Sequence, residues 1–210
     1  MPNWCVTNWK IKGSEEDVRA FVDIINDLPN RPDVEENGFG KYWLKNLAVA
    51  LGVDPDTCDN LRGCIDTDSG LCASWVFPES DEMEKLESNI LDDGNAIAAF
   101  STSSAWSMPD WLANYLEDRF EIGYSATDEF GNFHIVYNTN LFPWVYELHA
   151  EDFWEEYKIG EEDKVIKDLC RILEIDEPGQ KNRKTLKELV STHQDEIYDK
   201  EIEMIIYDIE

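Results

Sequence analysis

The fold is decided by one stretch in the middle of the chain, AIAAFSTSSAWSMPDW at residues 96–111. Residues 96–102 form an apolar run of strand length that follows the turn residues 92–95. Ser107 then precedes Met108-Pro109-Asp110, which places a hydroxyl at a helix N-cap, proline in the first turn and a carboxylate near free N–H groups. The stretch therefore predicts a buried strand, a turn, and a helix that Ser107 caps.

The segments that follow continue the same unit. Apolar residues at helical spacing predict that the helix ends near Phe120. Residues 122–126 and 133–137 alternate between apolar side chains and polar or small ones, and the glycine-containing segment 128–132 between them is typical of a turn. We therefore expect a β-hairpin after the helix.

The N-terminal segment predicts a strand and a helix. Residues 4–12 have strand character, with Trp9 and Ile11 on one face. Ser14-Glu15-Glu16-Asp17 has the form of a capping box, and apolar residues then recur at helical spacing until Leu28-Pro29-Asn30. A strand followed by an amphipathic helix is the first half of a split βαβ unit.

The chain becomes less regular between residues 31 and 91. In this insertion we expect a helix at 42–51, strands at 61–65 and 71–77, and a short helix at 81–91.

Residues 141–210 are acidic, yet their pattern indicates folded structure. Helical spacing recurs at 164–173 and 184–192, and residues 201–209 alternate like a strand. The predicted fold class is therefore α+β: split βαβ elements in residues 1–140, with inserted helices around 31–91, and an acidic α/β C-terminal extension.

Two motifs resemble a known family. The opening Met1-Pro2-Asn3-Trp4-Cys5-x-x-Asn8, followed by Ile11 and Gly13, resembles the start of the YubB-type ferredoxin-like proteins of phages and conjugative plasmids. Ala105-Trp106-Ser107-x-Pro109, and the later tyrosine and glycine hairpin, are similar to the second half of that family. The resemblance implies a ferredoxin-like split βαβ sandwich in a protein of a mobile element, with no iron–sulfur cluster and no catalytic residues to carry over. Its signature positions in this chain are Trp4, Asn8, Trp106, Ser107 and Pro109.

Charge is the outlying property of the composition. The 210 residues include 46 acidic and 18 basic side chains, which gives a formal net charge of −28. Such a field repels nucleic acids and anionic membranes and speeds encounter with basic surfaces. The alternative is that the charge only keeps the chain soluble. The five cysteines form no CxxC pair and the N-terminus has no signal-peptide pattern, so we expect a cytoplasmic protein. The resemblance to phage and plasmid proteins implies that this is the cytoplasm of a bacterial host.

Catalytic and metal-binding patterns are weak. The three histidines have no HxH or HExxH spacing, and His134 is the least implausible base. Serines crowd the central turn without a GxSxG elbow. Asp54-x-Asp56 and Asp66-x-Asp68 lack the glycine and distal glutamate of a calcium loop, and Gly38-x-Gly40 alone is no phosphate loop. We therefore expect no catalytic residue, no metal and no cofactor.

The tryptophans allow two interpretations. Trp4, Trp9, Trp106 and Trp111 either pack in the core or form an aromatic platform for bases on the sheet. Base stacking normally accompanies Lys and Arg residues that follow the phosphates, whereas acids outnumber bases here. We therefore expect core packing and no direct nucleic-acid binding.

The charge suggests a protein partner instead. Rows of carboxylates imitate phosphates and occupy a nucleic-acid groove on another protein. The candidate partner-binding residues are Glu84, Glu87, Asp92, Asp93, Glu147, Glu151, Asp152, Glu155, Glu156, Glu161, Glu162 and Asp163. We therefore expect a non-enzymatic mobile-element protein that binds and inhibits a host nucleic-acid-handling or defence protein, with no membrane partner and no assigned oligomeric state.

Two alternatives stay open. One is a small-molecule or nucleotide-processing enzyme, in which Ser104, Trp106 and His134 gather in a deep cleft. The other is a regulatory domain that binds a protein without mimicry, with each acidic run a solvated face. The arrangement of the charges and the presence of a polar cleft distinguish these three functions.

Overall fold

The computed structural model describes residues 3–36, 40–66, 85–129 and 134–209. The chain is a mixed α+β structure that divides into two compact units, residues 1–133 and 134–210. Several predicted features lie outside the described residues: the strand at 71–77, Glu84 with residues 81–83, the second aspartate of Asp66-x-Asp68, the first glycine of Gly38-x-Gly40, and the turn from residue 130 onward.

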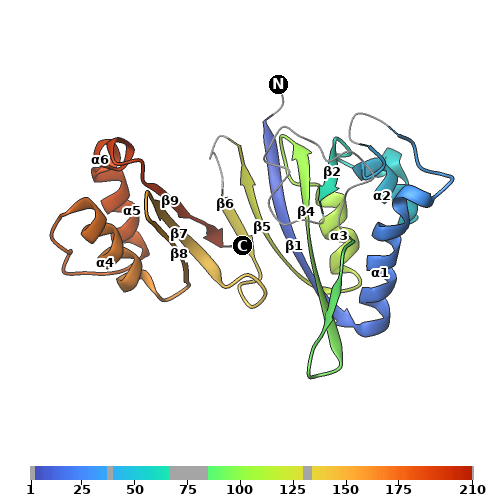
Figure 1. The fold of residues 1–210 in the computed structure, drawn as a ribbon, viewed down its shortest axis with the longest axis horizontal. Coiled ribbons are helices and arrows are strands. Elements are labelled where there is room, and N and C mark those ends of the chain that lie inside the picture. Colours follow the sequence, from blue (N-terminus) through green and yellow to red (C-terminus); the bar gives the residue numbers. More distant parts are fainter. Residues whose placement is uncertain (1–2, 37–39, 67–84, 130–133, 210) are drawn as a thin grey trace. The chain divides into compact units, whose positions relative to one another are not determined.

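The N-terminal unit is built on the long strand β1, Trp4–Ser14 (Figure 1). Along its whole length β1 pairs antiparallel with β4, Asn95–Ala105, and its other edge pairs antiparallel with β5, Glu121–Asp128. The far edge of β4 pairs antiparallel with β2, Gly63–Asp66, and with β3, Ser88–Ile90. The strands of this unit therefore lie in the order β5-β1-β4-β2, with β3 also beside β4.

Helices connect these strands and cover one side of the sheet. They are α1, Glu15–Asp27, α2, Leu44–Ala50, and α3, Asp110–Glu117, with 3-10 turns at Leu28–Asn30 and Pro55–Thr57. Figure 1 shows α1, α2 and α3 on the same side of the sheet. The first strand and helix, the helix near 42–51, the strand near 61–65, the strand at 96–102 and the helix after Pro109 are confirmed as predicted.

The core of this unit lies between the sheet and α1. Trp9 and Ile11 are fully buried on the predicted common face. The Phe21 ring of α1 lies with its centroid 5.6 Å from that of Phe100 on β4. The indole N–H of Trp9 donates to Thr102 Oγ1 at 2.9 Å, which satisfies its buried polar group. Trp9 is therefore a core residue and is not part of an exposed platform for bases.

The first helix begins where the sequence places it. Ser14 is the N-cap, and its Oγ accepts a hydrogen bond from the Asp17 N–H at 3.2 Å. The same hydroxyl donates to Asp17 Oδ2 at 2.6 Å. Val18, Phe21, Val22 and Ile25 form the buried face of α1.

The short helix predicted at 81–91 is wrong for the residues that the structure describes. Ser88–Ile90 form strand β3 along the edge of β4, and Ile90 is 55% exposed. The Asn26 side chain binds the backbone just before β3. Its amide N–H donates to the Leu86 carbonyl, and its oxygen accepts from the Leu86 N–H, both at 2.9 Å. The spacing of apolar residues carries no information on this contact with α1, so the prediction failed here.

The predicted cap of α3 by Ser107 is also wrong. The N-cap residue is Pro109, and the helix N–H groups are satisfied by Asp59, which accepts from the N–H of Asp110 at 3.2 Å and of Trp111 at 2.9 Å. Trp106 has a left-handed backbone with φ of 69°, so the chain turns before the helix begins. Ser107 is consequently two residues before the N-cap, beyond the reach of the free N–H groups.

The capping contacts predict different effects for two substitutions. Asp59→Ala is expected to lower the free energy of unfolding by about 1 kcal/mol because α3 loses its side-chain cap. Ser107→Ala is the control and is expected to change it by less than about 0.5 kcal/mol. Urea unfolding followed by circular dichroism measures both, and a larger loss for Ser107→Ala would contradict the assignment of the cap.

The C-terminal unit contains a three-stranded antiparallel sheet. Its strands are β7, Trp144–Ala150, β8, Phe153–Lys158, and β9, Glu203–Ile206, in the order β8-β7-β9. In the same unit β6, His134–Tyr137, pairs in parallel with β10, Asp208–Ile209. The alternation of residues 201–209 predicted a strand there, whereas β7 and β8 were not predicted.

Three helices cover one side of this sheet in Figure 1. They are α4, Glu162–Leu173, α5, Arg183–Thr192, and α6, Gln194–Asp199. α4 and α5 confirm the helices predicted at 164–173 and 184–192, whereas α6 was not predicted. Buried residues of the strands and helices, including Leu148 and Ile166, form one hydrophobic core. Among all the described helices of the chain, none has the length and apolar character needed to cross a membrane.

Candidate functional site on the C-terminal sheet

One face of the C-terminal sheet carries charged and aromatic side chains. Successive side chains of a strand point to opposite faces, and the core takes Tyr146, Leu148 and Tyr157 on one face. The register of the three strands places on the other face Glu147, His149, Trp154, Glu156, Glu203 and Ile205. These six residues are named the acid face.

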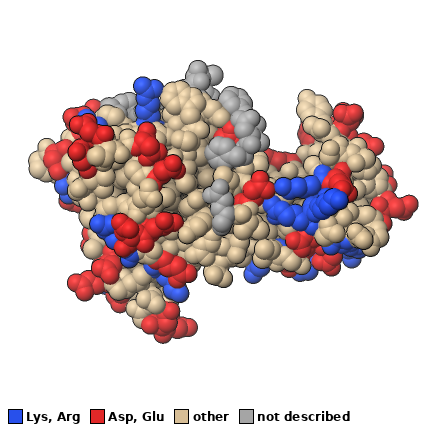
Figure 2. All heavy atoms as spheres, turned by 180° about the vertical axis from the view of Figure 1, so that it is seen from behind, with Lys and Arg blue, Asp and Glu red and all other residues tan. Residues whose placement is uncertain are grey.

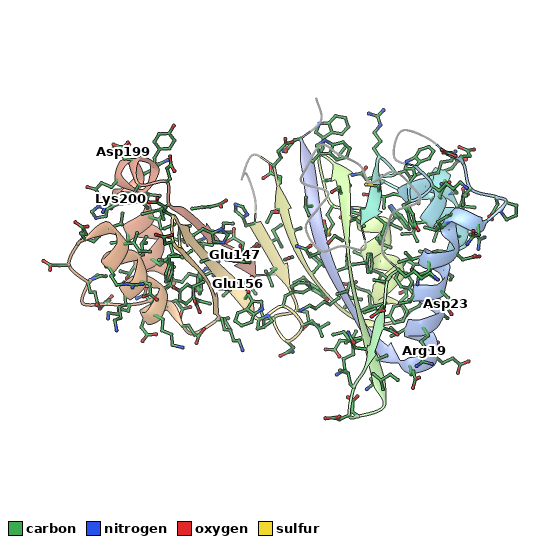
Figure 3. The ribbon with its side chains drawn as sticks, viewed as in Figure 1. Arg19, Asp23, Glu147, Glu156, Asp199 and Lys200 are labelled. Atoms are coloured by element: carbon green, nitrogen blue, oxygen red, sulfur yellow. The ribbon has the colours of Figure 1, made fainter. Side chains whose placement is uncertain are left out.

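Two glutamates of the acid face stand directly opposite each other. Glu147 of β7 is the register partner of Glu156 of β8, and Figure 3 labels the two side chains on these adjacent strands. Like charges at opposed positions of neighbouring strands destabilise a sheet. A destabilising pair retained in the folded protein is a reason to assign it a function.

Tyr207 holds one of these carboxylates in place. Its hydroxyl donates to Glu147 Oε1 at 2.5 Å, and the tyrosine is buried. Burial raises the pKa of the Tyr207 phenol, and the nearby charges of Glu147, Glu156 and Glu203 raise it further. The phenol therefore stays protonated and acts as a fixed hydrogen-bond donor within a cluster of three carboxylates.

His149 lies between two of the carboxylates. Its Nε2 is 3.5 Å from Glu147 Oε2, and its Nδ1 is 3.6 Å from Glu203 Oε2. These are ion-pair distances, and Nε2 has no hydrogen-bond partner in the described part of the chain. The ring also packs edge-on against Trp154, with centroids 5.6 Å apart. A protonated His149 would partly neutralise the acid face.

Other phenols of this unit hold acids in the same way. The Tyr146 hydroxyl donates to Glu162 Oε1 at 2.5 Å, and the Tyr157 hydroxyl donates to Asp168 Oδ2 at 2.9 Å. Burial, followed by the hydrogen bond to Glu162, raises the pKa of Tyr146 to about 12. Burial and Asp168 also raise the pKa of Tyr157.

The predicted partner-binding acids of residues 147–163 do not form one surface. Glu151 and Asp152 are exposed in the turn between β7 and β8, and Glu162 is bound by Tyr146. Glu161 accepts from the Lys158 N–H at 2.9 Å and pairs with Lys164, whose hydrogen bond lowers the pKa of Glu161. Glu155 on β8 and Asp163 on α4 are exposed. Only Glu147 and Glu156 of this group belong to the acid face.

The predicted acids of the N-terminal unit that the structure describes flank strand β3 in the sequence. Glu87 is an exposed residue before β3, and Asp92 and Asp93 occupy the turn before β4. Asp93 accepts from the Asn95 N–H at 3.0 Å, and this hydrogen bond lowers its pKa. Asp93 therefore has a role in the turn itself.

Only Glu147 and Glu156 of the acid face were predicted from the sequence. His149, Trp154, Glu203 and Ile205 were missed, as was Tyr207, which binds Glu147. A signal for part of the site was present, because Glu147 and His149, and Trp154 and Glu156, are each two residues apart, as side chains on one face of a strand must be. Recognition of the strands β7 and β8 would have placed these four residues together. Only the register with β9 brings in Glu203.

The residues predicted to form a family signature have structural contacts in the N-terminal unit. Asn8 links three strands, since it donates to Ser125 Oγ at 3.3 Å and accepts from Ser101 Oγ at 2.7 Å. The Trp4 carbonyl accepts from the Glu129 N–H at 2.8 Å. These contacts stabilise the strands around β1.

The central turn is held by main-chain and amide contacts. The Asn60 amide donates to the carbonyls of Ala105 at 2.9 Å and Ser107 at 2.8 Å. Trp106 is 57% exposed, with the Arg62 guanidinium carbon 5.6 Å from its ring centroid. Pro109 is buried at the start of α3. The signature residues thus shape a turn, and among them Trp106 alone presents a large exposed side chain.

Two of the residues named for an enzyme, Ser104 and His134, each have contacts within their own unit. The Ser104 hydroxyl is buried and donates to the Ser107 carbonyl at 2.7 Å, so it is committed to the turn. The His134 ring packs edge-on against Tyr207, with centroids 5.8 Å apart. Within the ranges that the structure describes, no group of three His, Cys, Asp or Glu side chains is arranged to hold a metal.

Both units share the acidic excess. Residues 1–133 contain 26 acidic and 9 basic residues, and residues 134–210 contain 20 and 9. Figure 2 shows acidic side chains dispersed over both units, with lysine and arginine side chains gathered on the C-terminal one. On α5, Arg183, Lys184 and Lys187 line a shallow depression. The acid face is therefore a local arrangement within a widely acidic surface.

Comparison with known proteins gives no relative: no protein-family model, no curated protein and no solved structure matches the chain. The functional interpretation therefore depends on the geometry of the acid face.

The hydrogen bond from Tyr207 predicts a measurable loss of stability. Tyr207→Phe is expected to lower the free energy of unfolding by about 1.5 kcal/mol near pH 7, because Glu147 loses its donor among like charges. Tyr198→Phe is the matched control, since Tyr198 is 82% exposed, and its effect is expected to stay within about 0.5 kcal/mol. Equal unfolding curves for the two variants would contradict this role of Tyr207.

The raised phenol pKa values predict sensitivity to alkali. Unfolded tyrosines release their protons near pH 10, whereas Tyr146, Tyr157 and Tyr207 hold theirs to higher pH in the folded protein. The stability that these phenols contribute is therefore present below about pH 10 and is lost as pH rises above it. Urea unfolding at increasing pH should show this decline, with a shallower slope in Tyr207→Phe. An identical slope in both proteins would contradict it.

Proposed function

We propose that this chain is a non-enzymatic protein that binds a basic, nucleic-acid-binding surface of another protein through the acid face. The observation that carries the proposal is the opposed pair Glu147 and Glu156, with Glu203 nearby, on the face of the sheet that the helices leave uncovered. Negative charges held in fixed positions on a sheet match a surface that normally receives phosphates.

The rigidity of the acid face supports this function. Glu147 is held by Tyr207, and the strand pairing fixes the positions of Glu147, Glu156 and Glu203. A side chain that is already fixed loses less conformational entropy on binding than a mobile one. The exposed Trp154 next to His149 adds an aromatic surface over which an arginine or lysine of the partner can lie.

The organisation of the N-terminal unit supports a ferredoxin-like fold for residues 1–133. Its strand order is β5-β1-β4-β2 with antiparallel neighbours, α1 follows β1, and α3 connects β4 to β5. This is the arrangement of two split βαβ units. Together with the signature positions Trp4, Asn8, Trp106, Ser107 and Pro109, it supports the resemblance to the YubB-type family. The partner that we propose is accordingly a host or defence protein in the bacterial cytoplasm, which the chain inhibits on behalf of a mobile element.

A regulatory protein-interaction domain without mimicry is the second candidate. It is favoured by the similar acidic excess of the two units, since a purely solubilising charge would also be spread over the whole chain. The two candidates differ in whether the partner's nucleic acid competes with the chain.

Affinity capture from a bacterial lysate tests the leading proposal. The immobilised chain should retain basic nucleic-acid-binding proteins at low salt and release them at high salt or on addition of duplex DNA, because screening and competing phosphates both weaken the contact. Retention that resists salt and duplex DNA would contradict mimicry and favour the regulatory domain.

Charge-neutralising variants locate the interaction. The combined substitution Glu147→Gln, Glu156→Gln and Glu203→Gln is expected to abolish the salt-sensitive retention. Asp23→Asn, Glu117→Gln and Asp195→Asn together remove the same charge from exposed positions on α1, α3 and α6, and should leave retention nearly unchanged. An equal loss in both variants would show that total charge, rather than the acid face, determines binding.

A further inference from the structure

His149 lies on the acid face between carboxylates of two strands. Its Nε2 is 3.5 Å from Glu147 Oε2 on β7, and its Nδ1 is 3.6 Å from Glu203 Oε2 on β9. Glu156 is the register partner of Glu147 on β8, and the Trp154 ring packs against the imidazole. Each of the three strands therefore contributes a carboxylate to the neighbourhood of the imidazole.

The neutral imidazole can donate to only one of its two carboxylate neighbours. Neutral histidine carries one N–H, and its other ring nitrogen is an acceptor. Whichever nitrogen of His149 carries the proton, the other directs a lone pair toward a carboxylate oxygen. Consistent with this mismatch, Nε2 is buried and has no hydrogen-bond partner among the described residues. A second proton on the ring would give both nitrogens an N–H to donate.

Glu147 is the acid that this second proton affects most directly. Tyr207 already donates to Glu147 Oε1, which leaves Oε2 for a partner. Because Oε2 lies 3.5 Å from His149 Nε2, the doubly protonated ring directs an N–H at it. The charged ring also reduces the negative charge of the acid face by one. A proton on His149 and a basic side chain of a partner therefore compete for the same carboxylate oxygen.

We propose that protonation of His149 switches the acid face off, so that the chain binds a basic partner in neutral solution and releases it in mildly acidic solution. The inference rests on the proposed function, because it specifies how binding at that surface is regulated. Histidine is the side chain whose charge ordinarily changes between about pH 5 and 8. The affinity is expected to fall as the pH falls, because the charged ring repels the partner's cations and engages Glu147.

Other titratable groups face the same place, and they determine the controls. Protonation of the carboxylates of Glu147, Glu156 and Glu203 in more acidic solution would also weaken the binding of a cation. The Tyr207 phenol donates to Glu147 and stays protonated, because burial and the nearby carboxylates raise its pKa. The His134 ring packs against Tyr207, and its buried Nδ1 has no hydrogen-bond partner in the described ranges. His134 is therefore the second histidine whose titration must be separated from that of His149.

An arginine peptide tests the switch without titrating itself. The probe is a short, fluorescently labelled peptide in which arginine and serine alternate and both ends are blocked, because arginine stays charged throughout this range. Fluorescence anisotropy with the full chain, at constant ionic strength, is expected to show roughly tenfold weaker binding at about pH 5.5 than at about pH 7.5. His149→Gln is expected to lose most of this pH dependence. His149→Arg, whose charge is permanent, is expected to bind weakly at both pH values.

His134→Gln and His193→Gln are the matched controls. Each removes a histidine outside the acid face, and His193 also contacts a glutamate, Glu196. Both variants should keep the pH dependence of the unmodified chain. An equal pH dependence in the unmodified chain and in His149→Gln would assign the effect to the carboxyl groups and overturn the switch. Loss of the dependence in His134→Gln, with retention in His149→Gln, would also overturn it.

A measurement on the chain alone separates this inference from the proposed function. The NMR signal of the Trp154 indole N–H should move over the same pH range, because its ring contacts His149, and should stay in place in His149→Gln. Peptide binding without movement of this signal would overturn the switch and leave the proposed function standing. A moving signal with no peptide binding at either pH would overturn the proposed function, and with it the regulation inferred here.

Discussion

Forty-six carboxylates share this chain with eighteen lysine and arginine residues, so most of the carboxylates cannot be neutralised by ion pairs. The fold accommodates several of them with neutral donors. Tyr146, Tyr157 and Tyr207 each donate a phenol hydrogen bond to an acid of the C-terminal unit. In the N-terminal unit, Asp59 accepts the free N–H groups of α3. Such contacts hold the carboxylates in fixed positions.

This constraint connects stability to function. A phenol that donates to a carboxylate is a neutral partner, whereas a lysine would offset the carboxylate's charge. Glu147 is such a carboxylate, and the strand register places it opposite Glu156 and near Glu203. The hairpin of β7 and β8 carries four residues of the acid face, Glu147, His149, Trp154 and Glu156.

The sequence predicted those elements whose residues alternate or repeat regularly. Trp9 and Ile11 marked the buried face of β1, and Ser14 marked the start of α1, because these signals act between neighbours in the sequence. The cap of α3 was missed because Asp59 lies 51 residues before Asp110. β7 and β8 were missed because glutamates and aromatic residues interrupt the apolar alternation. The acid face depends on the register between strands that are distant in the sequence. Composition alone predicted only that the surface charge is negative.

The central turn has a structural role, whereas its unusual sequence suggested a functional one. Its serine hydroxyl at Ser104 is buried and bound to a carbonyl, and the Asn60 amide fixes its backbone. These contacts make the turn a means of positioning strands and α3. The charges that we assign to function lie instead in the C-terminal unit, where the sheet arranges them on one face.

The central claim is that the acid face occupies a surface used by nucleic acid. Fluorescence anisotropy with labelled duplex DNA, bound to a basic partner obtained by capture, tests it most directly. Addition of this chain should displace the DNA, and the Glu147, Glu156 and Glu203 glutamine variant should displace it far less. A ternary complex, in which the DNA stays bound while the chain binds the same partner, would contradict the claim.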